Sequence, residues 1–138
     1  MRYLGYCDAH QSAGLAINES LSVTSGASKE EGFAALEAAL KSGIEFDAVF
    51  AASDALAISS ISALTQLGIS VPGDILVVGY DDITMAAYYT PTISTIRQDR
   101  VLGGALLVEK LLKIINGEEI ESALIPTELV VRNSSSKN

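Results

Sequence analysis

The chain has 138 residues, of which 49% are hydrophobic, 19% charged and 6% aromatic, with 17 acidic side chains against 9 basic ones and a net charge of −8. This length corresponds to about one domain and allows roughly two thirds of the unfolded surface to be buried. The mean hydropathy of +0.33 excludes a disordered acidic tail, and no apolar run reaches the roughly 20 residues of a membrane span. Because phosphate binding rests on Lys and Arg, we expect no binding of DNA or of an anionic membrane by this chain alone.

The N-terminus and the cysteine content indicate the compartment. The first five residues, M-R-Y-L-G, contain no apolar leader, which predicts that the chain carries no secretory signal of its own. The single cysteine, Cys7, excludes an intramolecular disulfide, and nothing else suggests a metal cluster or another cofactor. We therefore expect a soluble, cytoplasmic domain without a cofactor.

The first predicted elements are a helix end, a short strand and a well-marked helix. Residues 2–6 resemble the end of a helix, and residues 21–23 favour a short strand. Ser28 opens a helix with the capping-box pattern S-K-E-E, and Gly43 is a plausible stop. The apolar positions between them have helical spacing: Phe33, Leu36 and Leu40.

A strand–helix–strand unit follows and fixes the fold class. Residues 46–52 form an apolar run of strand length, Ser53-Asp54 caps a second helix that ends at Gly68, and residues 75–80 are apolar on both faces. A strand buried on both faces belongs to a parallel sheet, and the connection between parallel strands is right-handed. We therefore predict the α/β class with a mostly parallel sheet.

The C-terminal part of the chain contains a helix that is apolar over nearly its whole circumference. It runs from about Val101 to Ile115, and only Glu109, Lys110 and Lys113 form a polar stripe. Such a helix requires packing on most sides, so we infer a partner for it, either another subdomain or a second subunit. Residues 129–131 favour a last strand, and residues 133–138 a polar, frayed tail.

Two pairs of polar residues follow predicted strands, where ligands bind in open α/β sheets. Ser53-Asp54 follows the first strand and Asp81-Asp82 the second. The first pair also fits a simple helix cap, and the second fits a solvated turn. A carboxylate at a sheet edge suits neutral polyols, because it accepts hydrogen bonds from adjacent hydroxyls.

Catalysis has little support in the sequence. His10 lies in a polar, loop-like stretch, Cys7 has no basic neighbour, and Gly103-Gly104 lacks the third glycine of a dinucleotide fingerprint. A phospho-acceptor receiver domain would place its acidic pair near the N-terminus, whereas Asp81-Asp82 comes late in this chain. We therefore expect a protein that is not an enzyme.

Five segments of the chain carry distinctive motifs. They are D-A-V-F-A-A-S-D-A-L-A-I at 47–58, G-I-S-V-P-G-D-I at 68–75, V-V-G-Y-D-D at 77–82, P-T-I-S-T-I-R-Q at 91–98 with Leu102-Gly103, and the closing P-T-E-L-V-V-R-N-S at 126–134. These motifs resemble those of the lactose-repressor (LacI/GalR) type of bacterial regulators, and R-Y-L-G-Y at 2–6 fits that family's helix end. Their order and spacing make the resemblance specific.

The resemblance implies a two-lobed, periplasmic-binding-protein-like sensor that holds a sugar or another small metabolite. Residues 1–132 would be the C-terminal part of this domain, an incomplete, Rossmann-like, three-layer α/β/α lobe. The helix at 101–116 would pack on a missing N-terminal lobe or a second subunit. The helix-turn-helix headpiece, through which such regulators bind DNA as homodimers, would be absent.

Carried over by position, the family's effector contacts fall on Arg2, Ser53, Asp81 and Gln98. Asp54 would serve mainly capping and loop structure. Two departures bear on the ligand: Ala27 stands near a position where several members stack an aromatic ring on the sugar, and Arg100 stands where some members have an aromatic. These departures favour a smaller or anionic effector.

The family's dimer contacts would fall on the outer face of the helix after Ser53, at Ala57, Ile58 and Ile61, and on Tyr88 and Tyr89. Core packing would explain some of these residues equally well. A sugar-binding receptor of a transport system is the main alternative, opposed by the lack of a signal peptide and by the motifs V-G-Y-D-D and L-V-x-R. An enzyme is a third, opposed by the lack of a nucleophile–base set.

Overall fold

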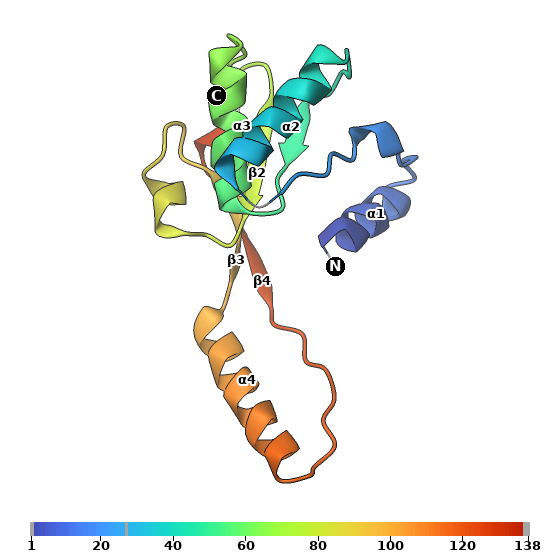
Figure 1. Cartoon of the computed structure of the whole chain (residues 1–138), viewed down its shortest axis with the longest axis vertical. Coiled ribbons are helices and arrows are strands. Elements are labelled where there is room, and N and C mark those ends of the chain that lie inside the picture. The colour runs from blue at the N-terminus through green and yellow to red at the C-terminus, as the bar shows by residue number, and fades with distance from the viewer. Residues whose placement is uncertain (1, 27, 137–138) are drawn as a thin grey trace.

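The computed structural model describes residues 2–26 and 28–136 (Figure 1). Its α-helices are α1 (Arg2–Ser12), α2 (Lys29–Lys41), α3 (Asp54–Gln66) and α4 (Arg100–Ile115). Its strands are β1 (Ala48–Phe50), β2 (Leu76–Tyr80), β3 (Ser94–Gln98) and β4 (Thr127–Val130), and three short 3-10 helices are η1 (Glu19–Leu21), η2 (Thr84–Ala87) and η3 (Asn133–Ser135).

The four strands of the described residues form one sheet in the order β1-β2-β3-β4. β1, β2 and β3 are parallel, with Val49 opposite Val77 and Gly79 opposite Thr95, and β4 runs antiparallel to β3. The unit β1–α3–β2 confirms the predicted strand–helix–strand unit and the α/β class. Sequence patterns did not predict β3, because its residues S-T-I-R-Q are mostly polar.

The core lies between the sheet and α3, and α2 packs against α3 and contributes Leu36 to the same core. The capping box predicted at Ser28 is present, since Glu31 N donates to Ser28 Oγ at 3.2 Å and the Glu31 carboxylate accepts from Ser28 N at 3.1 Å. Burial of α3 is nearly complete along its sheet side, where Ala57, Ile61 and Leu64 are at most 1% exposed. The sheet and the helix layer formed by α2 and α3 thus account for two of the three layers of the expected α/β/α lobe.

α4 stands away from this core, as Figure 1 shows. The chain enters α4 directly after β3 and returns from it to the sheet in β4. Gly103 is its buried residue, and large apolar side chains along it are exposed, among them Val101, Leu107 and Ile115. The predicted extent of this helix is confirmed to within one residue. Within the described residues α4 is also largely uncovered, as its apolar circumference led us to expect.

Three local predictions were wrong. Residues 2–6 begin α1, which continues to Ser12, and residues 21–23 contain the end of η1 and extended chain without strand pairing. The tail is not frayed over residues 133–136, since Ser134 in η3 is fully buried. Its Oγ accepts from Ser94 N at 2.8 Å and donates to Val77 O at 2.6 Å, which ties the end of the described chain to β2 and β3.

Candidate functional site

Polar groups gather where β1, β2 and β3 end, at one edge of the sheet. Because the three strands are parallel, the residues after Phe50, Tyr80 and Gln98 leave the sheet at the same side. The chain turns sharply after β2, where Asp81 has φ 109° and Asp82 has φ 47°. Left-handed backbone at a residue other than glycine costs on the order of 1–3 kcal/mol, so surrounding contacts must hold this turn.

Three of the four predicted ligand residues meet at the Asp81 carboxylate. Arg2 Nη2 donates to Asp81 Oδ1 at 2.9 Å, and Gln98 Nε2 donates to the same oxygen at 3.0 Å. Arg2 also lies over the ring of Tyr80, 4.0 Å from its centroid, and donates to Ala52 O just after β1. The guanidinium of Arg2 in α1, the carboxylate of Asp81 directly after β2 and the side-chain amide of Gln98 in β3 thereby lie side by side.

Ser53, the fourth predicted ligand, is the N-cap of α3. Its Oγ accepts from Leu56 N at 3.3 Å, and the side chain is half-buried. It follows Ala52, whose carbonyl accepts from Arg2, so the first turn of α3 adjoins the Arg2 side chain. The helix-cap interpretation of Ser53 is thus confirmed, and its hydroxyl retains the capacity to donate to a ligand.

Asp82 points to a different set of partners. Arg97 Nε donates to Asp82 Oδ2 at 2.6 Å, and Arg132 Nη2 donates to Oδ1 at 2.7 Å. Burial alone would raise the pKa of the Asp82 carboxyl, but the hydrogen bonds from Arg97 and then Arg132 outweigh it and hold the pKa below its ordinary value. Arg97 also pairs with Glu128 at 3.4 Å, which joins the turn to β3 and β4.

A buried network under the turn was not predicted as part of the site. Asp54 is fully buried, and its carboxylate accepts from Thr95 Oγ1 at 2.6 Å and from Ile83 N at 2.8 Å. The prediction of a loop-structuring role for Asp54 is therefore confirmed, whereas Ser53 supplies the cap. Gly79 makes room for Asp54, because a Cβ there would lie 2.2 Å from Asp54 Oδ1. Thr95 lies in the motif at 91–98, but no role was predicted for it.

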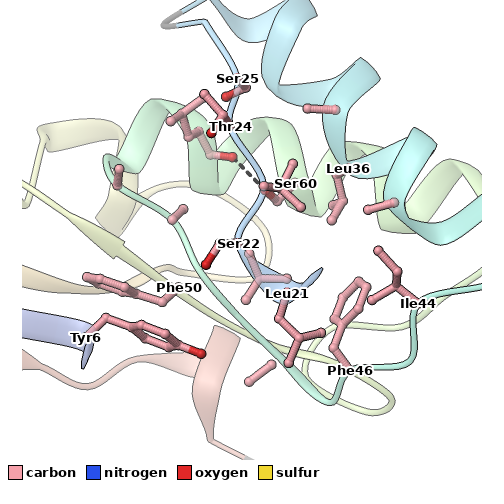
Figure 2. Close-up of a pocket in the computed structure, with 18 of the residues that line it drawn as sticks. Tyr6, Leu21, Ser22, Thr24, Ser25, Leu36, Ile44, Phe46, Phe50 and Ser60 are labelled. Carbon is pink, nitrogen blue, oxygen red and sulfur yellow. Dashed lines mark hydrogen bonds between the residues drawn. The ribbon is translucent and has the colours of Figure 1, made fainter. Parts of the chain in front are cut away.

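Two hollows adjoin this edge. The larger, a groove of about 1200 Å³, lies between residues 19–25 and the segment around β1. Figure 2 shows Leu21, Ile44, Phe46 and Phe50 along its walls, which makes it mostly apolar. A smaller hollow of about 450 Å³ is lined by residues of β3, α4 and β4, including Gln98 and Arg100. Arg100 and Gln98 thus face a common space, while Ala27 lies outside the described residues.

The residues considered for catalysis and for metal binding include His10 and Cys7. His10 lies in α1 rather than in the expected loop, with Nδ1 3.1 Å from Tyr6 O and its ring 4.1 Å from that of Tyr6. Cys7 is free and half-buried. No group of three His, Cys, Asp or Glu side chains in the described part could hold a metal ion. None of the described helices is both long and apolar enough to span a membrane.

The predicted dimer residues separate into buried and accessible ones. Ala57 and Ile61 are at most 1% exposed, so the expectation that they lie on an outer face of α3 is wrong; their apolar character serves the core. Ile58 and Tyr89 are half-buried against the same core, and Tyr88 is 79% exposed. The accessible part of the predicted set is therefore centred on Tyr88.

Comparisons with known proteins define the class. Residues 1–135 match the family model of the periplasmic binding protein-like domain. The chain is 36% identical to the HTH-type transcriptional repressor PurR of Pasteurella multocida over 135 residues, which are 96% of this chain and 40% of that protein. It is also 36% identical to a lactose operon repressor of Rhizobium radiobacter over 109 residues, which are 78% of this chain and 96% of that protein.

A solved structure agrees with these matches. The chain resembles the transcriptional regulator CelR in its cellobiose complex, with a TM-score of 0.88, 34% identity, and coverage of 97% of this chain and 42% of that one. The chain belongs to the LacI family of transcriptional regulators, in the part that carries their periplasmic-binding-protein-like domain. It spans about 40% of the length of the PurR repressor that it matches. These relatives are regulators of transcription, which favours that interpretation over the transport receptor.

Proposed function

We propose that this chain is the effector-sensing part of a LacI-family regulator, and that it binds a sugar or a similar small polyhydroxy metabolite at the carboxyl edge of its sheet. The observation that carries the proposal is the convergence of Arg2 and Gln98 on Asp81 Oδ1. A carboxylate accepts from two adjacent hydroxyls, while a guanidinium and an amide donate to the oxygens of the same ligand. The CelR structure, which holds cellobiose, supports a sugar as the ligand class.

The roles follow from the geometry. Asp81 would accept from paired hydroxyls, Arg2 and Gln98 would donate, and Ser53 would exchange hydrogen bonds at the N-terminus of α3. Because Arg2 already pairs with Asp81, the site is close to neutral, which suits an uncharged ligand. The anionic effector that Arg100 suggested would instead meet Arg100 in the smaller hollow, which Arg100 lines together with Gln98.

The remaining parts of the function concern partners. We propose that the regulator is a cytoplasmic homodimer without enzymatic activity or a cofactor, and that it contacts DNA through a helix-turn-helix headpiece separate from residues 1–132. The net charge of −8 supports a separate DNA-binding surface. Tyr88, together with the half-buried Ile58 and Tyr89, stays our candidate for the dimer contact. The exposed apolar face of α4 supports its packing on an N-terminal lobe or a second subunit.

A titration of the isotope-labelled chain with cellobiose tests the proposed site. We expect the amide resonances of residues 81–83 and the side-chain resonances of Arg2 and Gln98 to shift at millimolar sugar, and Asp81→Ala to abolish these shifts. Asp47→Ala is the matched control, because Asp47 is an exposed carboxylate at the opposite end of β1. Shifts that persist in Asp81→Ala, or that fall only on Leu21 and Phe46 of the apolar groove, would contradict the proposal.

A further inference from the structure

The turn at residues 81–83, which carries Asp81, is hydrogen-bonded to the buried side chain of Asp54. Asp54 Oδ2 accepts from Ile83 N at 2.8 Å, and Asp54 Oδ1 accepts from Thr95 Oγ1 at 2.6 Å. The same Thr95 hydroxyl oxygen accepts from Asp82 N at 3.3 Å. The two peptide N–H groups that follow Asp81 therefore both end on the pair formed by Asp54 and Thr95.

This pair is placed to act on backbone conformation rather than on a ligand. Asp54 and Thr95 are both fully buried, so neither side chain reaches solvent or the site surface. Consecutive N–H groups with left-handed backbone form a concavity that accepts an anion, and here φ is 109° at Asp81 and 47° at Asp82. The Asp54 carboxylate, held at the first turn of α3, accepts directly from Ile83 N and is linked to Asp82 N through the Thr95 hydroxyl.

Two further sets of contacts hold the turn. Asp81 N donates to Ile96 O at 2.9 Å, which fixes the start of the turn against β3. The Asp82 side chain is clamped by Arg97 and Arg132. With these contacts in place, the backbone conformation at Asp81 and Asp82 decides the direction of the Asp81 side chain, whose Oδ1 meets Arg2 and Gln98.

We propose that Asp54 and Thr95 are positioning residues that hold the 81–83 turn in its left-handed conformation and thereby aim the Asp81 carboxylate at the effector. The proposal rests on the assignment of Asp81 as an effector ligand. Because the pair is buried beneath the turn, its contribution is separate from any contact with the ligand. Loss of either partner releases Asp82 N or Ile83 N and lets the turn relax.

Two shape-conserving variants and one rescue test the proposal. Thr95→Val removes the hydroxyl, Asp54→Asn removes the carboxylate charge and one acceptor oxygen, and Thr95→Ser keeps the hydroxyl. Asp47→Asn is the control, because it makes the same chemical change at an exposed residue. Two quantities are measured on each folded variant: the side-chain amide resonances of Gln98, which report its hydrogen bond to Asp81 without any sugar, and the dissociation constant for cellobiose.

We expect Thr95→Val and Asp54→Asn to shift the Gln98 side-chain amide resonances and to weaken cellobiose binding by about tenfold or more, which corresponds to about 1.4 kcal/mol or more. Thr95→Ser and Asp47→Asn should stay at wild-type values. Should one of the first two variants fail to fold, the other carries the test.

Unchanged Gln98 resonances and cellobiose affinity in a folded Thr95→Val or Asp54→Asn protein would overturn the proposal, even if the variant were less stable, because the pair would then serve stability alone. The proposed function fails separately, if Asp81→Asn leaves the cellobiose dissociation constant unchanged. In that case the Gln98 resonances still decide whether the pair positions Asp81.

Discussion

Gly79→Ala should destabilise the protein strongly, although the same change in unstrained backbone usually stabilises. Gly79 lies in β2 beside α3, and a methyl group there would sit 2.2 Å from Asp54 Oδ1 and 3.2 Å from both Asp54 Cα and Ala57 Cβ. The Asp54 side chain would have to move, but its two oxygens are held by Thr95 and Ile83 N. The added methyl group would also lie close to the backbone of α3 at Asp54 Cα, which moves less easily than the end of a side chain.

The magnitude follows from two opposing effects. Replacing glycine by alanine restricts the unfolded chain and contributes about 0.4–1 kcal/mol of stability. Against this, overpacking of a core costs about 1–3 kcal/mol, and loss of a hydrogen bond to a buried charged group about 1.5–3 kcal/mol. We expect a net loss of about 2–5 kcal/mol in the free energy of unfolding.

Urea denaturation followed by far-ultraviolet circular dichroism measures this loss. Gly104→Ala is the control: a Cβ at Gly104 meets no heavy atom within 4 Å, and alanine in a helix interior should add about 0.5–1 kcal/mol. In an Asp54→Ala background the penalty of Gly79→Ala should fall, because the clashing carboxylate is gone. An unchanged or higher urea midpoint for Gly79→Ala in the wild-type background would refute the reasoning.

Three further predictions concern the turn, the tail and α4. Asp82→Asn should cost about 1–3 kcal/mol at pH 7, because it weakens the pairing with Arg97 and Arg132. Folding lowers the pKa of Asp82, so the stability that its carboxylate contributes is present above the unfolded carboxyl pKa of about 3.9 and is lost as the pH falls through the lower folded pKa. The denaturation curves of the variant and the wild type should therefore converge toward about pH 2. A difference in stability that stayed constant with pH would contradict this. Ser134→Ala should cost about 1–3 kcal/mol by thermal denaturation, because Ser94 N and Val77 O lose their partner, whereas a change near zero would restore the frayed-tail interpretation. Leu107→Glu should change the free energy of unfolding by less than about 0.5 kcal/mol, since Leu107 is 72% exposed, and a larger loss by urea denaturation would indicate that α4 is covered in solution.

The elements that sequence patterns predicted are those encoded over a few neighbouring residues. The capping box at Ser28, the helix after Ser53 and the all-apolar helix near 101–115 follow from spacings of three and four positions. Strand β2 follows from an apolar run with a turn before it. Motif order over residues 47–134 was specific enough to indicate the family, which the comparisons confirmed.

The patterns failed where distant pairing decides the structure. Strand β3 is mostly polar and forms because β2 and β4 satisfy its backbone on both sides. Ala57 and Ile61 are apolar, as both a core and a dimer face require, and only the packing of α3 on the sheet placed them inside. Ser134 is polar and close to the end of the chain, yet β4 brings the chain back to the sheet, where Ser134 hydrogen-bonds to the backbone of Val77 and Ser94.

For the candidate site, the sequence determined which side chains follow the strands and which family they resemble, because those features lie within single segments. The tertiary structure decided that Arg2 and Gln98 share one oxygen of Asp81, and that Asp54 supports the turn through Thr95. These contacts join residues 17 to 79 positions apart. Local periodicity carries no information on such pairs, because they form only when parallel strands end at one edge and a helix N-terminus meets them there.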